Sequence, residues 1–147
     1  MNNHYEKEER LKVVYVEPDK PAKIIEVDNT LEELQRLVGG GLIQPCYYFD
    51  EPVTLVCNDE GWLLGMPPNR AVFNEKTGEI LTIISGSFFL CYAPPYSEHF
   101  HSLSEKQLRK YKEKFRYPEL FVKTDLGIAV VSAQKKKRSR DRRDEGR

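Results

Sequence analysis

Residues 11–41, LKVVYVEPDKPAKIIEVDNTLEELQRLVGGG, contain two strand patterns followed by a helix pattern, and this order decides the fold class. Leu11 to Val16 is rich in β-branched and aromatic residues and stops at Glu17-Pro18-Asp19, a turn signal. Lys23 to Val27 repeats the strand pattern. The two segments therefore predict an opening β-hairpin.

The helix pattern begins at Thr30, and Thr30-Leu31-Glu32-Glu33 has the spacing of a capping box. Four apolar residues then share one predicted helical face: Leu31, Leu34, Leu37 and Val38. The run Gly39-Gly40-Gly41 follows. A phosphate-binding loop would precede a helix N-terminus, whereas these glycines follow a helix. We therefore interpret them as a C-cap, since glycine adopts the left-handed conformation without steric cost.

The rest of the chain alternates short strand patterns with turn signals and adds one more helix. The expected strands are 42–49, 53–57, 62–66, 79–84 and 87–92, with a last hairpin at 120–123 and 128–131. Residues 67–72 are expected to form an ordered loop or a single turn because they begin with two prolines. Ser102-x-x-Glu105 and Ser104-x-x-Gln107 both fit a capping box. The helix that follows has an apolar stripe at Leu108, Tyr111 and Phe115 and ends before Pro118. We predict an α+β fold, a small, mainly antiparallel sheet of short strands and hairpins with two short helices in a single domain.

The 147 residues suffice for one ordinary domain, and charge is unevenly placed along them. We expect a disordered polar head at 1–10, a domain at 11–133 and a disordered basic tail at 134–147. Within the domain, 94–133 is expected to be a helix-hairpin extension of a unit at 11–93. The last thirteen residues carry a net charge of +5, so the remainder of this formally neutral chain carries −5.

Nothing in the sequence indicates export or membrane insertion. The N-terminus MNNHYEKEER is polar, and the longest apolar run, Phe88 to Ala93, is far shorter than the ~20 residues that span a bilayer. The three cysteines, Cys46, Cys57 and Cys91, are interpreted as reduced thiols. We therefore expect a cytoplasmic protein that does not contact membranes.

No catalytic residue, metal site or cofactor site is predicted. Cys91, His99 and His101 lack the paired spacing of zinc ligands, and both histidines are expected to be solvated. Ser85-Gly86-Ser87 lacks the frame of a nucleophile elbow. The carboxylates lie in turns, where they are normally hydrated. These patterns favour a protein that is not an enzyme and leave the question open.

The first candidate ligand contacts are Asn69 and Arg70, with Asn58 in the preceding turn. Pro67 and Pro68 would stiffen the backbone before the Arg70 fork, which suits a carboxylate or phosphate. The alternative interpretation is an asparagine turn cap with a structural ion pair.

Basic residues suggest a second kind of contact, with nucleic acid. The tail offers Lys135, Lys136, Lys137, Arg138 and Arg140, and the helix 105–116 carries six Lys or Arg residues. The tail has no aromatic residue to stack on bases. A solubilising tail and a solvated helix face are the alternative interpretations.

Several spaced motifs resemble a known family. They are Val16-Glu17-Pro18, Leu31-x-x-Leu34-Gln35-x-x-Val38-Gly39-Gly40, 55–61 (LVCNDEG), 65–71 (GMPPNRA) and Gly78-Glu79-Ile80-x-x-Ile83-Ile84-x-Gly86-x-Phe88. Through them, Val13 to Tyr92 resembles the domain-of-unknown-function family numbered 3846, found in phages, plasmids and integrative elements of Firmicutes and other gut bacteria. Ser102 to Phe121 is similar to an extension seen in some members. The resemblance implies a mobile-element origin and a small accessory role, with no established activity or site.

Three functional hypotheses follow. The first is a non-enzymatic binding protein of a mobile element, such as a host-defence antagonist that captures a ligand or a host protein. The second is a nucleic-acid-associated accessory protein that uses the basic tail and the helix 105–116. The third is a small enzyme whose site the motifs do not reveal. The oligomeric state stays open.

Overall fold

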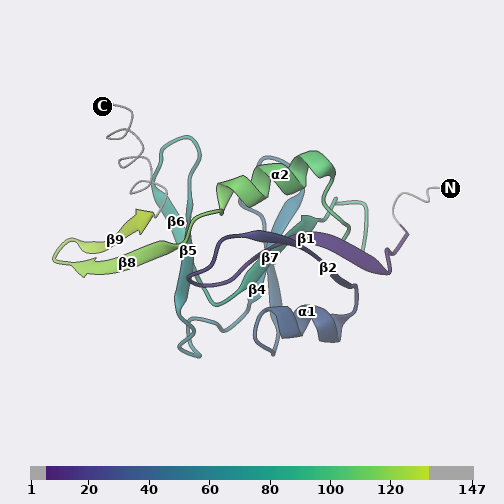
Figure 1. Ribbon diagram of the computed structural model, residues 1–147, viewed down its shortest axis with the longest axis horizontal. Coiled ribbons are helices and arrows are strands. Elements are labelled where there is room, and N and C mark those ends of the chain that lie inside the picture. The colour runs from purple at the N-terminus through teal and green to yellow at the C-terminus, as the bar shows by residue number, and fades with distance from the viewer. Residues whose placement is uncertain (1–5, 133–147) are drawn as a thin grey trace, which may run out of the picture.

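A five-stranded antiparallel sheet, in the order β2-β1-β7-β4-β3, forms the centre of the computed structural model, which describes residues 6–132 (Figure 1). Its strands are β1 (Arg10–Val16), β2 (Lys23–Asp28), β3 (Ile43–Cys46), β4 (Val53–Asn58) and β7 (Phe88–Tyr92). The central strands β4 and β7 are buried at nearly every position. The predicted α+β fold and the opening hairpin are confirmed.

The two helices cover opposite faces of this sheet (Figure 1). α2 (Glu105–Lys114) packs on the face that carries Leu55, Phe88 and Leu90, whereas α1 (Leu31–Leu37) packs on the face that carries Val56 and Phe89. Since successive side chains of a strand point to opposite faces, neighbouring residues such as Phe88 and Phe89 lie in different cores. The sheet is thus the middle layer of three.

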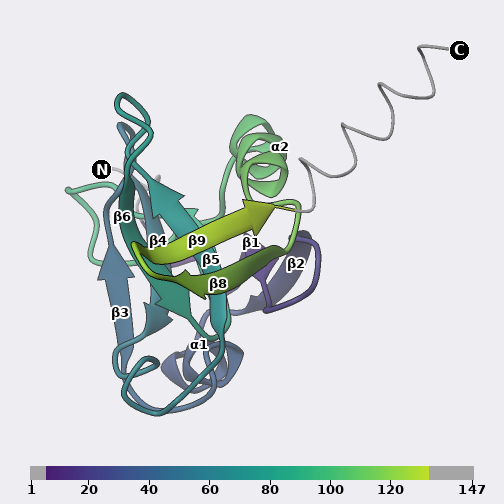
Figure 2. The same cartoon turned by 90° about the vertical axis from the view of Figure 1, so that its left-hand side faces the viewer.

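Two small antiparallel sheets lie beside this body (Figure 2). One pairs β5 (Pro68–Phe73) with β6 (Ile80–Ser85), and the other pairs β8 (Glu119–Thr124) with β9 (Gly127–Ser132). The prediction that 67–72 forms a loop or a turn is therefore wrong, because Pro68 begins β5. The first position of a strand tolerates the missing N–H of proline. The final hairpin is confirmed.

Residues 62–66, predicted to form a strand beside β4, instead make a series of turns. The neighbours of β4 are β3 and β7, and these two strands leave no place for a third. The predicted strand 42–49 is also shorter than expected, since β3 ends at Cys46. β3 is an edge strand of the sheet, which explains how it holds Pro45.

The first helix is capped at both ends, with two differences from the sequence pattern. The Thr30 hydroxyl accepts a hydrogen bond from the Glu33 amide at 3.2 Å, but the Glu33 carboxylate pairs with Arg36 instead of completing a capping box. Leu31, expected on the buried face, is exposed. Its N-terminal position in the helix lies beyond the edge of the core.

The glycine run ends α1 as predicted. Gly39, Gly40 and Gly41 all have φ between +83° and +93°. The Gly40 amide donates to the Gln35 carbonyl at 2.8 Å, and the Gly39 amide donates to the Arg36 carbonyl at 3.1 Å. These two bonds define a Schellman motif, which satisfies the last carbonyls of the helix.

The second helix follows the sequence closely. Its capping box joins Ser104 and Gln107, and its stripe at Leu108, Tyr111 and Phe115 is buried. The N-terminal head ends earlier than residue 10, since Arg10 belongs to β1 and the Glu9 carbonyl accepts from Asn29. Residues 1–5 and the tail 134–147 lie outside the described residues.

Substitution of the glycine run tests the cap. Gly40→Ala places a side chain at φ +93°, which should lower the free energy of unfolding by about 1 kcal/mol. Gly39→Ala, at φ +92°, should cost a similar amount, because its new Cβ would lie 2.8 Å from Met66 Cε, the movable end of a flexible side chain. Urea unfolding measures both, with exposed Glu32→Ala as the control, expected within about 0.5 kcal/mol of the parent. Glycine variants as stable as the parent would show that no left-handed cap is needed.

Candidate functional site

An exposed apolar loop between β4 and β5 is the most unusual surface feature of the described residues. We call residues 59–66 the Trp62 loop. Trp62 is 79% exposed, Leu63 73% and Leu64 61%. Three adjacent large apolar side chains in water are costly, because each leaves most of its surface hydrated. A single exposed leucine is ordinary on a protein surface, whereas a contiguous group indicates an interaction site.

Asn58 immediately precedes the Trp62 loop, and the amide and oxygen of its buried side chain are both hydrogen-bonded. Its amide donates to the Val38 carbonyl at 3.1 Å and to the Gly40 carbonyl at 2.5 Å. Its side-chain oxygen accepts from the Glu60 amide at 2.8 Å. Asn58 therefore ties the start of the Trp62 loop to the C-terminal turn of α1.

Backbone contacts keep the loop itself in one conformation. The Leu64 amide donates to the Glu60 carbonyl at 2.9 Å, and the Met66 amide donates to the Gly61 carbonyl at 3.0 Å. Gly61 lies so close to β6 that an added Cβ would stand 2.7 Å from the Ser85 carbonyl oxygen. The exposed side chains thus stand on a hydrogen-bonded base.

The Met66 side chain anchors the end of the loop among glycines. A Cβ added at Gly39 or Gly86 would stand 2.8 Å or 2.7 Å from atoms of Met66. Only residues without side chains leave room for the thioether there. The apolar residues of the loop therefore divide, with Met66 turned inward and Trp62 turned outward.

Asn69, predicted as a ligand contact, is buried behind this loop. Its amide donates to the Val16 carbonyl and the Gly86 carbonyl, both at 2.9 Å. Its side-chain oxygen accepts from Arg70 at 2.8 Å. Asn69 thus joins β5 to the end of β1 and to the turn between β6 and β7.

Arg70, the other predicted contact, is completely buried. Its five N–H groups make five hydrogen bonds: two with the Phe115 carbonyl (3.1 and 3.0 Å), one with the Lys20 carbonyl (2.6 Å), and two with the carbonyl and side-chain oxygens of Asn69 (3.2 and 2.8 Å). Burial lowers the pKa of the guanidinium. A ligand would have to displace one of these partners.

The expected structural alternative for Arg70 was an ion pair with a buried carboxylate, and the structure replaces it with carbonyl oxygens. The nearby Glu119 carboxylate accepts instead from the Ala71 amide at 2.8 Å. Its pKa is raised by burial, against the lowering effects of that amide and of Arg70. The three predicted ligand residues, Asn58, Asn69 and Arg70, therefore use their side chains in hydrogen bonds within the fold.

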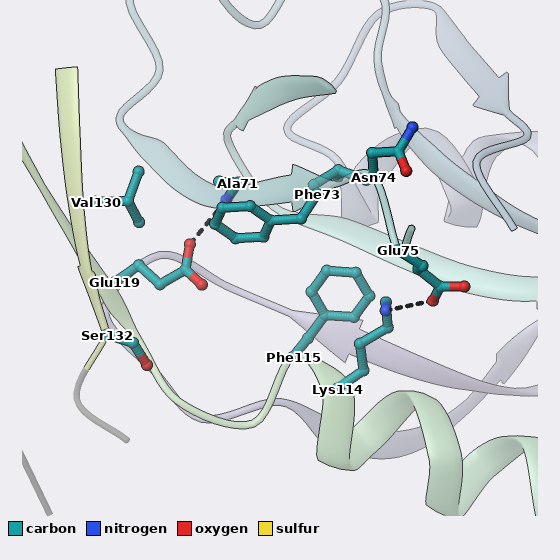
Figure 3. Close-up of a pocket in the computed structure, with 10 residues that line it drawn as sticks. Ala71, Phe73, Asn74, Glu75, Lys114, Phe115, Glu119, Val130 and Ser132 are labelled. Carbon is teal, nitrogen blue, oxygen red and sulfur yellow. Dashed lines mark hydrogen bonds and ion pairs between the residues drawn. The ribbon is translucent and has the colours of Figure 1, made fainter. Parts of the chain in front are cut away.

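A cavity of about 650 Å³ opens between β5, the end of α2 and the β8–β9 hairpin (Figure 3). Phe73, Phe115 and Val130 supply its apolar wall. Two of its charged groups, Lys114 and Glu75, pair with each other at 2.7 Å, and one oxygen of the Glu119 carboxylate accepts from the Ala71 amide. No sequence motif predicts this cavity, because its walls come from segments up to 61 residues apart, at Ala71 and Ser132.

A hydrogen-bonded chain of Ser97, His101 and Glu8 is a second feature that the sequence did not reveal. Ser97 Oγ lies 2.7 Å from His101 Nε2, and His101 Nδ1 lies 3.2 Å from Glu8 Oε2. His101 is 3% exposed, so its expected solvation is wrong. Ser97 also lines a cavity of about 470 Å³. A nucleophile, a base and an orienting acid are thus in reach of one another.

Sequence reasoning missed this chain for a simple reason. Glu8 is 93 residues from His101 and lies in the segment expected to be a disordered head. The Glu8 carboxylate is fixed a second time, by the Ser102 amide at 3.2 Å. The signal available in the sequence was only Ser97-x-x-x-His101, which is common in loops.

Three of the six basic residues in the segment 105–116 form ion pairs within the fold. Lys110 pairs with Glu51, Lys114 with Glu75 and Arg116 with Glu113. The Glu51 carboxylate also accepts from Tyr111 and Gln107, and these bonds lower its pKa to about 2. The tail residues Lys135, Lys136, Lys137, Arg138 and Arg140 lie outside the described residues, so a nucleic-acid contact there stays a prediction.

Residues 6–132 hold neither a cluster of metal ligands nor a helix that could span a membrane. There, no three His, Cys, Asp or Glu side chains gather in a way that would hold a metal ion. None of the described helices has the length and apolar character needed to cross a bilayer. The three cysteines are free thiols, and burial raises the pKa of Cys91 well above its ordinary value.

Fold and site together define a small three-layer α+β domain with a rigid apolar loop on its surface. Residues 11–116 match the family model described as Domain of unknown function (DUF3846), and the chain belongs to this family. The match confirms the resemblance and continues past residue 93 through α2, ending before the β8–β9 hairpin. Comparison with curated proteins and with solved structures found no significant match.

Proposed function

We propose that the protein is an accessory protein of a mobile genetic element that acts by binding another protein through the Trp62 loop. The exposure of Trp62, Leu63 and Leu64 on a fixed base is the observation that carries this proposal. Tryptophan is among the residues that most often dominate binding energy at protein interfaces. Leu42, also exposed, lies at the foot of the loop, where its carbonyl accepts from the Asp59 amide.

Rigidity makes this loop effective as a binding element. A loop that must be ordered on binding loses affinity to that ordering, whereas the Trp62 loop is already fixed by Asn58, Gly61 and Met66. The Trp62 loop would therefore present a preformed apolar protrusion to the partner. This arrangement favours a partner with an apolar pocket.

Charge beside the loop narrows the partner further. Asp59 and Glu60, separated from Trp62 only by Gly61, are exposed. The chain outside its last thirteen residues carries a net charge of −5. A pocket with a basic rim would complement this surface, and opposite charges also speed association. Capture of a host defence protein by such a surface fits the accessory role that the family resemblance implies.

Loop substitution tests this function. The partner is first isolated from a bacterial host lysate with the parent chain. The double variant Trp62→Ser/Leu63→Ser should raise the Kd for this partner at least 30-fold, equivalent to about 2 kcal/mol of binding free energy. The matched control is Leu126→Ser, which removes a fully exposed leucine from the β8–β9 turn. Calorimetry with the purified partner measures both. The loop variant should melt like the parent, because the removed side chains contact mainly water.

Two results would contradict the proposal. One is a loop variant that binds the partner as tightly as the parent. The other is an equal loss in Leu126→Ser, which would show non-specific adhesion of exposed apolar groups.

The Ser97–His101–Glu8 chain favours a second candidate function, acyl transfer from a small ester. Ser97 Oγ would attack the carbonyl carbon as its proton passes to His101 Nε2, with Glu8 holding the imidazolium. His101 would return the proton to the leaving alkoxide, and water would then hydrolyse the acyl-serine. The distances of 2.7 and 3.2 Å suit both proton transfer and orientation.

Acetyl ester hydrolysis tests this candidate. With p-nitrophenyl acetate, the parent should release nitrophenol and carry an acetyl group on Ser97, detected by mass spectrometry. Ser97→Ala should abolish both, and Glu8→Gln should slow release at least tenfold, because the base loses its orienting acid. Glu9→Gln changes the neighbouring exposed carboxylate and should have no effect. Equal release by Ser97→Ala and the parent would eliminate this candidate.

A further inference from the structure

The β8–β9 hairpin projects from the body and lies beyond the family match (Figure 1). One of its faces carries two apolar cross-strand pairs, since Leu120 pairs with Val131 and Val122 pairs with Ala129. Leu120 and Val122 are each about half exposed. An isolated two-stranded hairpin is marginally stable in water, so an apolar face left in solvent calls for a cover.

No strand of residues 6–132 other than β9 pairs with β8, so the outer edge of β8 is left open there. Asp125-Leu126 forms a two-residue turn closed by the pair Thr124 and Gly127. The closing pair of such a hairpin is hydrogen-bonded, and hydrogen-bonded pairs then alternate along the ladder. Leu120 and Val122 therefore direct their backbone groups towards β9.

The remaining residues of β8 direct their backbone groups away from β9. They are Glu119, Phe121 and Lys123. Within residues 6–132, these outward groups make no backbone-to-backbone hydrogen bond. An apolar strand with a free edge is a template for pairing with another strand.

We propose that this edge is a homodimer interface, in which β8 of two copies pair antiparallel about a twofold axis through Phe121. The product is a four-stranded sheet in the order β9-β8-β8-β9. Phe121 meets the partner's Phe121, and Leu120 meets the partner's Val122. The outward backbone groups of Glu119, Phe121 and Lys123 then all find partners. Each of the three residue pairs across the axis exchanges two hydrogen bonds, so the interface gains about six.

Charge selects this register over its neighbours. About Phe121, Glu119 faces the partner's Lys123 at both ends of the pairing. An axis through Lys123 would oppose two lysines, and an axis through Glu119 would oppose two glutamates, which is destabilising. A shift by one residue would turn the apolar face to the other side and misalign the outward groups. The register about Phe121 is self-complementary, as a twofold interface requires.

Glu119 is able to serve both contacts. Its Oε1 accepts from the Ala71 amide at 2.8 Å, which fixes the root of the hairpin against β5. Its second oxygen remains for the partner's Lys123. Pairing also joins the two apolar faces of Leu120 and Val122 into one continuous surface, in which each Leu120 lies beside the partner's Val122 and shields part of it from water.

Cross-linking on the axis tests the geometry. In a Cys46→Ser background, Phe121→Cys should form a disulfide-linked dimer in air, because the Cα atoms of a hydrogen-bonded antiparallel pair lie about 5.5 Å apart, within disulfide range. Leu126→Cys, on the same hairpin but off the axis, should not. Non-reducing electrophoresis measures both. Equal cross-linking of the two variants would overturn the register.

A proline variant tests the edge without depending on the cysteines. Lys123→Pro removes an outward N–H that β9 does not use, so the hairpin should persist while the dimer weakens at least tenfold. Sedimentation equilibrium of the full chain measures this. A parent chain that stays monomeric at high concentration, or a dimer unaffected by Lys123→Pro, would overturn the proposal; a dimer lost only in the Trp62→Ser/Leu63→Ser variant would place the contact on the other surface.

Discussion

The buried guanidinium of Arg70 is the interaction on which the arrangement of the outer elements depends. An unpaired charge in a protein interior is costly unless polar partners replace its lost water. Here five hydrogen bonds do so, and they come from three separate segments: Lys20 in the β1–β2 turn, Asn69 in β5, and Phe115 after α2. All three segments must be in place together before the charge is satisfied, so Arg70 couples β5 to the three-layer body.

This coupling explains how a surface loop can stay apolar and rigid. Asn69 extends the network of Arg70 to β1 and to the β6–β7 turn, and Asn58 performs the same task at the opposite end of the Trp62 loop. Polar side chains that look available for ligands are thus engaged in holding backbone. The groups left for recognition are the apolar ones, which is the reverse of what the sequence pattern indicates.

Local patterns predicted the elements whose signals are local. The β1–β2 hairpin, the glycine cap of α1 and the Ser104–Gln107 box of α2 depend on residues a few positions apart. The prediction failed where an apolar segment can be either a buried strand or an exposed loop. Trp62 to Met66 has the composition of a strand, yet only the pairing of β4 with β3 and β7 decides that no strand fits there.

The candidate sites were harder to predict because they depend on distant residues. Glu8 and His101 meet across 93 positions, and Arg70 finds its acceptors at Lys20 and Phe115. Backbone carbonyls carry no sequence signal, so an arginine that uses them cannot be told from one that awaits a phosphate. Charge alone predicts a carboxylate partner for Arg70, whereas its partners in the structure are backbone carbonyls and the Asn69 side chain.

Urea unfolding of an Arg70→Met variant tests this account most directly. The change removes the charge, keeps a side chain of similar length and leaves the carbonyls of Lys20 and Phe115 without their donors. The account predicts a loss of about 3–5 kcal/mol in the free energy of unfolding. Arg109→Ala, which truncates an exposed arginine of α2, should change it by no more than about 0.5 kcal/mol. An Arg70 variant as stable as this control would contradict the claim that the buried guanidinium holds the outer elements together.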